Sequence, residues 1–216
     1  MATPIFTIFL FLTSILAILS TTIAHHPPTS NHSKPKPKPE PTTNFIWSSC
    51  STTRYPPLCY NGLSRYANKI GKSHRQVALT ALAMSLSRAR SAARLVSRLK
   101  KAKGIKHREY EAVKDCIDTM SDGVDQLTRS FVELANLGQT DSEEFMWHMG
   151  NVQTWVSSAL TDESTCVDGL SDDGYSNNNG GSNNKVKGVI QMKVNNVAQL
   201  TSNALALVNR FVERYG

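Results

Sequence analysis

Apolar residues recur at alternating spacings of three and four along most of the chain after residue 73. This spacing places them on one side of a helix of 3.6 residues per turn and predicts amphipathic helices. Four stripes can be traced: Leu79, Leu82, Leu86, Ala89, Ala93 and Val96; Val113, Ile117, Met120, Val124, Leu127, Phe131 and Leu134; Phe145, Met149, Val152, Val156 and Ala159; Ile190, Val194, Val197, Thr201, Ala204, Val208 and Phe211. No alternating strand pattern competes with them, so the sequence predicts an all-α protein.

Residues that start and stop helices mark the ends of these stripes. Ser-His-Arg-Gln at 73–76 and Thr-Asp-Ser-Glu at 140–143 fit capping boxes, in which side chains bind the free amides of a first turn. Gly104 and Gly138 follow the first two stripes, as expected where helices end. We predict four long helices that pack as an antiparallel bundle, at 73–103, 106–136, 141–169 and 185–215.

The prolines are confined to the first part of the chain. All nine lie at or before Pro57, so the remaining residues lack the strongest helix breaker. Two short helices are predicted before the bundle, at 45–54 and 57–70, joined by Tyr-Pro-Pro. The Asn- and Gly-rich segment 174–184 is predicted to be a mobile loop.

The N-terminal segment has the composition of a targeting sequence. Residues 1–24 carry no charge and are followed by a polar, proline-rich stretch, which predicts a cleaved signal peptide; a membrane anchor is the alternative. Residues 25–44 alternate lysine with proline over part of their length and are predicted to be an extended linker, in which Asn31 is a glycosylation sequon. The mature chain is therefore predicted to be secreted, without a membrane segment, with its folded domain at 45–216.

Charge is strongly segregated along the chain, although the formal net charge is only +7. Residues 41–108 contain 14 Lys and Arg and no acid, whereas residues 109–173 contain 15 acids and two bases. A nucleic-acid binder needs a continuous basic face, so nucleic acid is not expected as a partner. Adjacent helices with complementary faces are expected, formed by Arg90, Arg94, Arg98 and Lys101 on the first and by Asp115, Asp118, Asp122 and Asp125 on the second.

The four aspartates of the second helix have two interpretations. Their spacings of three, four and three align them on one side of that helix. They can pair with the arginines of the first helix, or they can face a basic surface of a partner. Like charges at i,i+4 oppose helix formation, which favours an external reason for them. The sequence leaves both interpretations open.

Motifs of catalysis and metal binding are absent from the sequence. It contains no Gly-x-Ser-x-Gly, no His-Glu-x-x-His and no phosphate-binding glycine loop, and its six histidines are scattered. The four cysteines show no Cys-x-x-Cys spacing, so zinc is not expected. In a secreted chain they predict disulfides, with three connectivities possible. We predict a protein that is not an enzyme and that needs no metal or cofactor.

One segment resembles a known family. Residues 155–170 read Trp-Val-Ser-Ser-Ala-Leu-Thr-Asp-Glu-Ser-Thr-Cys-Val-Asp-Gly-Leu, which is similar to the third-helix signature of the plant invertase and pectin methylesterase inhibitor family. Cys50 and Cys59 flank a Tyr-Pro pair, and Cys116 follows in Ala-Val-Lys-Asp-Cys, in the order typical of that family. The resemblance covers residues 45 to 212.

The resemblance implies a fold, a disulfide pattern and a function. The fold is an up-down-up-down four-helix bundle at 73–215, preceded by a short N-terminal helical hairpin at 45–70. The implied disulfides are Cys50–Cys59 and Cys116–Cys166. Members are not enzymes; pectin methylesterase inhibitors act in the apoplast and cell wall, where each binds one enzyme molecule and covers its active-site cleft. The enzyme contacts carried over by position are Asp118, Asp122, Asp125, Thr165 and Asp168.

Three other functions remain open at this point. An invertase inhibitor of the same fold is expected to carry a Pro-Lys-Phe-type tripeptide, but no proline follows Pro57. A pro-region or folding helper of an esterase would precede a catalytic domain, and the absence of one before Gly216 favours a standalone protein. A bundle with a non-inhibitory binding role in the cell wall is the third.

Basic residues of the linker and first helix are candidates for binding acidic pectin. The turn at 137–141 and the loop at 174–184 look longer than usual, so no contacts are transferred there.

Overall fold

The computed structural model describes residues 41–101, 107–138, 140, 143–171 and 182–216. The predicted signal peptide, the sequon at Asn31 and most of the predicted linker lie outside the described residues. Where the structure is described, the chain is helical and contains no strand, as the apolar pattern predicts. None of the described helices has an apolar stretch long enough to span a bilayer.

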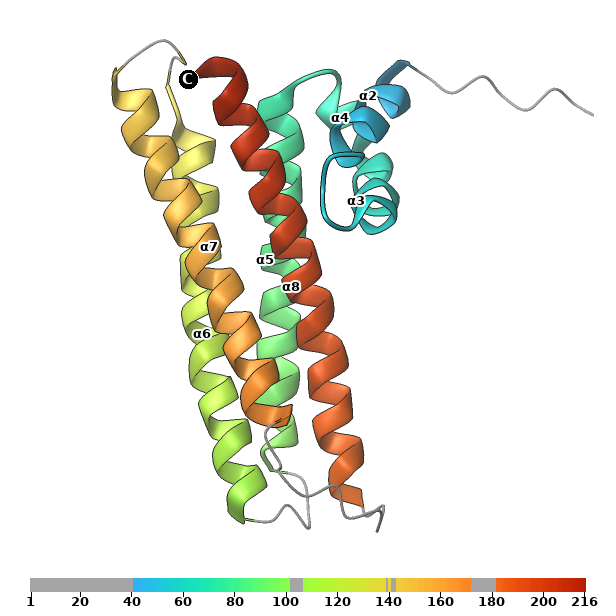
Figure 1. Ribbon diagram of the computed structural model, residues 1–216, viewed down its shortest axis with the longest axis vertical. Helices are drawn as coiled ribbons and strands as arrows, with labels where there is room; N and C mark the ends of the chain where they lie inside the picture. Colours follow the sequence, from blue (N-terminus) through green and yellow to red (C-terminus); the bar gives the residue numbers. More distant parts are fainter. Residues whose placement is uncertain (1–40, 102–106, 139, 141–142, 172–181) are drawn as a thin grey trace, which may run out of the picture. The chain divides into compact units, whose positions relative to one another are not determined.

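Four long helices form the body of the structure: α5 (His74–Leu99), α6 (His107–Asn136), α7 (Glu143–Ser171) and α8 (Ser182–Tyr215). Each packs against the next, and α8 packs back against α5, which closes the ring. Successive helices run in opposite directions (Figure 1). The predicted up-down-up-down antiparallel bundle is therefore confirmed.

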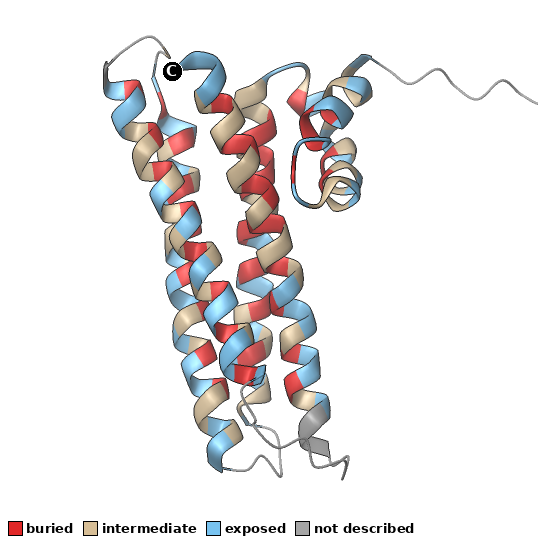
Figure 2. Ribbon diagram, viewed as in Figure 1, coloured by how far each residue is buried: buried red, intermediate tan, exposed pale blue. Residues whose placement is uncertain are grey.

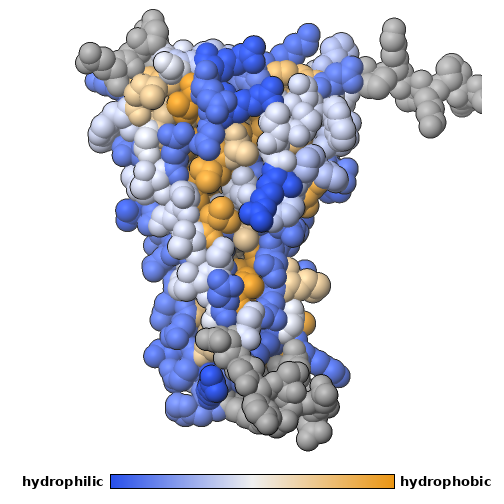
Figure 3. Space-filling view, viewed as in Figure 1, coloured by the Kyte–Doolittle hydropathy of each residue, from blue (hydrophilic) through white to orange (hydrophobic). Residues whose placement is uncertain are grey.

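The core is built from the inward-facing stripes of these helices (Figure 2). All the predicted stripe residues of α7 and α8 are buried. On α5 the buried face is wider than predicted and slightly rotated: Leu79 and Ala93 are half-buried, whereas Ala78, Ser85 and Ala92 are buried. The reason is that α5 also packs against two helices of the N-terminal hairpin, α3 and α4, in addition to α6 and α8. In the view of Figure 3 the outer surface is largely hydrophilic, with a narrow line of hydrophobic residues along the α7–α8 face.

Several predicted helix ends differ from the observed ones. Helix α5 ends at Leu99 rather than at 103, and α8 begins at Ser182 rather than at 185, so the last residues of the predicted loop 174–184 are helical. The first short helix, α2 (Pro41–Cys50), begins within the predicted linker and ends before 54. A proline is compatible with the first turn of a helix, because the amides of that turn have no intrahelical acceptor. Pro41 therefore does not prevent the helix from beginning before residue 45.

The second short helix is interrupted, contrary to the prediction of one helix at 57–70. It consists of α3 (Pro56–Leu63), a 3₁₀ turn (Ser64–Tyr66) and α4 (Ala67–Ile70). Tyr66, at φ −111° and ψ 19°, leaves the helical region and breaks the run. Gly71 then adopts φ +56°, a conformation that suits glycine and ends α4. Ser73 caps α5 as predicted, its Oγ accepting from the Gln76 amide at 3.3 Å.

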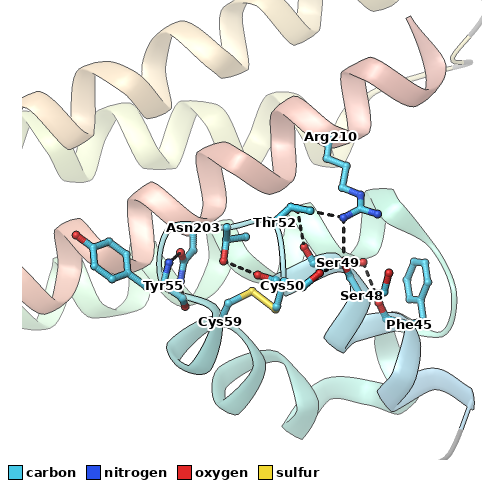
Figure 4. The surroundings of a disulfide bond; sticks show 11 residues. Phe45, Ser48, Ser49, Cys50, Thr52, Tyr55, Cys59, Asn203 and Arg210 are labelled. Atoms are coloured by element: carbon cyan, nitrogen blue, oxygen red, sulfur yellow. Dashed lines mark hydrogen bonds between the residues drawn. A yellow bond between two sulfur atoms is a disulfide. The ribbon is translucent and has the colours of Figure 1, made fainter.

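Polar contacts attach the hairpin to α8 (Figure 4). The buried Asn203 side chain accepts a hydrogen bond from the Tyr55 amide (2.9 Å) and donates one to the Tyr55 carbonyl (3.0 Å). Arg210 donates to the Ser48 carbonyl and to Thr52 Oγ1. The Cys50–Cys59 disulfide ties α2 to α3 beside these contacts, so the hairpin is held by one covalent and several polar links.

Arg75, in the first turn of α5, caps the far end of α6. Its Nη2 lies 3.1, 3.0 and 2.7 Å from the carbonyl oxygens of Leu134, Ala135 and Leu137. Helix α6 has no basic residue in its own last turn, and the last carbonyls of a helix lack intrahelical donors. The guanidinium therefore supplies both the hydrogen bonds and the positive charge that a helix C-terminus favours.

Replacing Arg75 by alanine is expected to lower the free energy of unfolding by about 1.5–3 kcal/mol, the usual range for hydrogen bonds to a charged group. Lysine should restore only part of this, because an ammonium is a point donor rather than a planar fork. Denaturant unfolding measures the effect, and Arg98→Ala, which removes an exposed arginine of the same helix, is the matched control. Equal losses in the two alanine variants would contradict the cap.

Candidate functional site

The predicted contact residues lie on α6 and α7, which pack closely against each other. Gly123 of α6 is buried against α7, and a Cβ built on it would lie 3.6 Å from the Ala159 carbonyl oxygen and 3.6 Å from Asp162 Cβ. An alanine side chain would already touch α7 at this position, so a larger one would push the helices apart. Gly123 thus sets how near the outer faces of the two helices lie.

The Cys116–Cys166 disulfide fixes the register of the same two helices. Its Cα atoms are 4.4 Å apart, and it matches the pairing that the resemblance implies. Asp118 and Thr165 lie within two residues of its two cysteines, and therefore at nearly the same height along the bundle. Since a helix rises about 1.5 Å per residue, Asp125 lies about 10 Å beyond Asp118 along α6. The candidate residues are thereby carried by a rigid, covalently linked pair of helices.

All five predicted contact residues, Asp118, Asp122, Asp125, Thr165 and Asp168, are exposed. Thr165 Oγ1 donates its hydrogen to the Thr161 carbonyl (2.9 Å), so the oxygen it presents to solvent can only accept. Thr165 and Asp168 line a shallow depression together with Gly169 and Ser171. We call the surface formed by these five residues and Asp162 the acidic face.

Asp162 belongs to this surface but was not predicted as a contact. Burial raises its pKa, and the Asp122 carboxylate raises it further. Its Oδ2 is buried and has no hydrogen-bond partner among the described residues. The residue lies in the Ala-Leu-Thr-Asp part of the signature segment, but its position near Asp122 depends on the packing of α6 on α7, which the spacing of residues along one helix does not specify.

The expected pairing between the basic first helix and the acidic second helix is not observed. Within the described parts of α5 and α6, no arginine or lysine of α5 forms a salt bridge with an aspartate of α6. Arg90 instead donates to Thr128 Oγ1 (3.2 Å). The two helices meet through their apolar sides, which directs their charged side chains outward in different directions. Among the described residues, no cation forms a salt bridge with a carboxylate of the acidic face.

The chemistry available to the acidic face is that of an acceptor surface. Ionised carboxylates only accept hydrogen bonds, and they favour arginine, lysine and amide donors of a partner. No cluster of three or more His, Cys, Asp or Glu side chains in the described residues is arranged to hold a metal ion. His148 pairs with Glu133 across α6 and α7, with Nδ1 2.6 Å from Oε1, outside the acidic face.

Comparison with known proteins points to one family. The family model described as plant invertase/pectin methylesterase inhibitor matches residues 44–207. Pectinesterase inhibitor 9 of Arabidopsis thaliana is 48% identical to this chain, over 96% of this chain and 95% of its own length. Pectinesterase inhibitor 11 of the same plant is 40% identical over 95% and 98%, and the 21 kDa protein of Daucus carota is 42% identical over 81% and 87%.

A solved structure shares the fold. The crystal structure of mutant form A of a pectin methylesterase inhibitor from Arabidopsis superimposes with a TM-score of 0.57, covering 76% of this chain and 95% of that one. The sequence identity of this pair is 19%. At this sequence identity, the structural similarity shows only that the two proteins share the same helical fold.

Proposed function

This chain belongs to the plant invertase/pectin methylesterase inhibitor family, and we propose on that basis that it inhibits a pectin methylesterase by covering the active-site cleft in a one-to-one complex. Family members are inhibitors rather than enzymes, so the prediction that this protein is not an enzyme is confirmed. Two relatives that match it over nearly their whole length are named pectinesterase inhibitors. The alternative target on the same fold is an invertase.

The observation that supports this most strongly is the acidic face itself. Its exposed carboxylates lie on two cross-linked helices and form no salt bridge within the described residues, so their charge is available to basic groups around an enzyme cleft. Because the α6–α7 pair is fixed by a disulfide and by close packing at Gly123, little conformational freedom is lost on binding. In this proposal the carboxylates orient the inhibitor on the enzyme, and the bulk of the helical bundle keeps the polysaccharide out of the active-site cleft.

The N-terminal organisation completes the proposal. We infer that residues 1–24 direct secretion and are removed, and that residues 25–40 separate the inhibitor domain from the cleavage site, with a glycan on Asn31. The protein then acts in the apoplast, where a secreted esterase meets its polysaccharide. Mass measurement of the protein from plant cell-wall extracts tests the cleavage site and the glycan together.

Replacing Asp122 by asparagine is expected to weaken inhibition about ten-fold or more, because a charged acceptor at the centre of the interface becomes a neutral amide. The fold should keep its stability or gain a little, because the Asp122 carboxylate lies unfavourably close to Asp162. Titration into a pectin methylesterase, followed by methanol release, measures the affinity; an acid invertase is assayed in parallel.

Asp115→Asn is the matched control, because it removes the same charge from an exposed position of the same helix that is outside the predicted contacts. Equal weakening by both variants would indicate general charge attraction rather than a contact at Asp122. Inhibition of the invertase alone would overturn the proposed target. Undiminished inhibition by Asp122→Asn would exclude the acidic face as the binding surface.

A further inference from the structure

Basic side chains gather along a groove between the N-terminal hairpin and the bundle, away from the acidic face. One wall comes from the hairpin and the other from α5, with α8 at one edge. Its volume is about 590 Å³. We call it the basic groove, and the residues used below are Arg65, Tyr66 and Lys69 on the hairpin and Thr80, Arg88 and Arg94 on α5.

Cations line the basic groove. Arg65, Lys69, Arg88 and Arg94 all contribute to it, and none of the described residues that line it is Asp or Glu. In the part of the chain that the structure describes, none of these four forms a salt bridge or a hydrogen bond to another side chain. Charges of one sign facing a cleft focus the field in it and attract the opposite charge. The basic groove is therefore complementary to an anion.

The remaining lining fits a ligand rich in hydroxyl groups. Asn61, Ser87, Ser91 and Asn196 bring amide and hydroxyl groups to the groove, and the ring of Tyr66 is 45% exposed. An exposed aromatic ring offers a flat apolar face, while arginine binds carboxylates through two parallel hydrogen bonds. A single aromatic side chain does not favour binding of a nucleic acid strand, because the successive bases of a strand need successive aromatic side chains to stack on.

The groove continues along α5 into two smaller depressions. One, of about 290 Å³, shares Lys69, Thr80 and Ala83 with it, and the other, of about 300 Å³, shares Ala83, Ser87 and Arg94. Among the described residues neither is lined by an acid. They add Arg75, which also caps α6, and Arg90, which also donates to Thr128. The three hollows follow one helix, so they fit an extended chain with repeated negative charges better than a compact anion.

We propose that the basic groove binds a linear oligosaccharide bearing carboxylates, with the arginines on the carboxylates, the Tyr66 ring on a sugar face and the Asn61, Ser87 and Ser91 side chains on sugar hydroxyls. The choice of a sugar acid rests on the proposed function, since hydrolysis of methyl esters on pectin leaves such carboxylates. The protein then holds the polymer that its target enzyme has already processed, through a surface separate from the inhibitory one.

Calorimetric titration of the oxidised protein with an unesterified oligogalacturonate, at low salt, tests this directly. Binding is expected, with little or none for the same oligomer fully methyl-esterified. The double variant Arg88→Ala/Arg94→Ala should lose about ten-fold or more in affinity. The matched double variant Arg98→Ala/Lys101→Ala removes the same charge from exposed positions of the same region outside the groove, and it should bind like the unmodified protein.

Tyr66→Ala separates recognition from general charge. It removes the aromatic ring proposed to contact a sugar face and leaves the charge of the groove unchanged, so affinity for the oligogalacturonate should fall about three-fold or more. Equal loss in the two double variants, or equally tight binding of a poly-glutamate of matched charge, would overturn the proposal. So would failure of the oligogalacturonate to bind.

The outcome is independent of the inhibitor proposal, because no esterase is present in the titration. Conversely, the Arg88→Ala/Arg94→Ala variant should inhibit the esterase, assayed on a short methyl-esterified substrate, as well as the unmodified protein. Loss of inhibition with retained oligosaccharide binding in Asp122→Asn would leave the basic groove intact as a separate site.

Discussion

Replacing Glu163 by glutamine is expected to remove most of the pH dependence of stability between pH 4.5 and about 8. Glu163 is fully buried in the core, and burial raises its pKa from 4.5 to about 8. Its Oε1 accepts a hydrogen bond from Thr201 Oγ1 at 2.9 Å, whereas its Oε2 is buried without a partner among the described residues.

The neighbouring hydroxyls define the direction of this buried chain. Ser85 Oγ lies 2.5 Å from Thr201 Oγ1. Because the single hydrogen of Thr201 goes to Glu163, Ser85 must donate to Thr201. The chain therefore links α5, α8 and α7 and ends on a carboxyl group. One hydrogen bond favours the carboxylate, but burial outweighs it, and the native protein holds the group neutral up to about pH 8.

The sign of the pH effect follows from the raised pKa. Below pH 4.5 the carboxyl is protonated in both the folded and unfolded chains, and its burial has no titration cost. As pH rises towards 8 the unfolded chain loses the proton while the folded chain keeps it, so stability falls and then levels off. One pKa unit corresponds to about 1.4 kcal/mol, so the loss across this window is roughly 4–5 kcal/mol.

Glu163→Gln should therefore be similar in stability to the unmodified protein at pH 4 and more stable by several kcal/mol at pH 8. Denaturant unfolding at a series of pH values measures both. Glu213→Gln, which removes an exposed carboxylate of α8, is the matched control and should leave the pH profile nearly unchanged. Parallel profiles for the unmodified protein and Glu163→Gln would show that Glu163 is ionised in the folded state.

Removing the Cys116–Cys166 disulfide with a double serine variant is expected to cost about 4 kcal/mol in the free energy of unfolding. The disulfide closes a loop with a sequence separation of 50 residues, and the entropy it removes from the unfolded chain grows with loop length. The variant should also lose inhibitory affinity beyond what its folded fraction explains, because the two helices of the acidic face are no longer fixed to each other.

The Cys50–Cys59 disulfide provides the comparison, since its sequence separation is only 9. The corresponding double serine variant should lose about 2–3 kcal/mol by the same loop argument and leave the acidic face unaffected. Thermal unfolding and esterase titration of both variants test this order. A larger loss from the hairpin disulfide, or unchanged inhibition without the bundle disulfide, would contradict it.

The bundle is predictable from the sequence because its core stripes are regular. The predicted stripe of α7 ends at Ala159, but the same spacing of three and four continues to Glu163, Cys166 and Leu170, all of which are buried. A carboxyl group on a core stripe is the sequence signal of a buried acid. A stripe defined by apolar residues alone does not include it.

Other features depend on contacts between distant residues and were not predictable from local pattern. The Asn203 contact with Tyr55 joins positions 148 residues apart, and the Arg75 cap joins positions about 60 apart. The salt bridges expected between α5 and α6 are not observed among the described residues. The charge pattern predicts which side of each helix is charged, but the rotation of each helix about its own axis decides which sides of two helices meet. The proximity of Asp162 to Asp122 depends on the same rotation of the helices and was not predictable for the same reason.

The separation of the acidic face from the basic groove makes the molecule an electric dipole. Helix α5, which carries one wall of the basic groove, packs against α6 and α8 and lies diagonally across the ring from α7. A dipolar protein rotates in the field of a charged surface before it touches it, which raises the fraction of collisions that are correctly oriented. Near an anionic polymer matrix, the basic side turns inward and the acidic side outward. In that orientation an approaching protein meets the acidic face first.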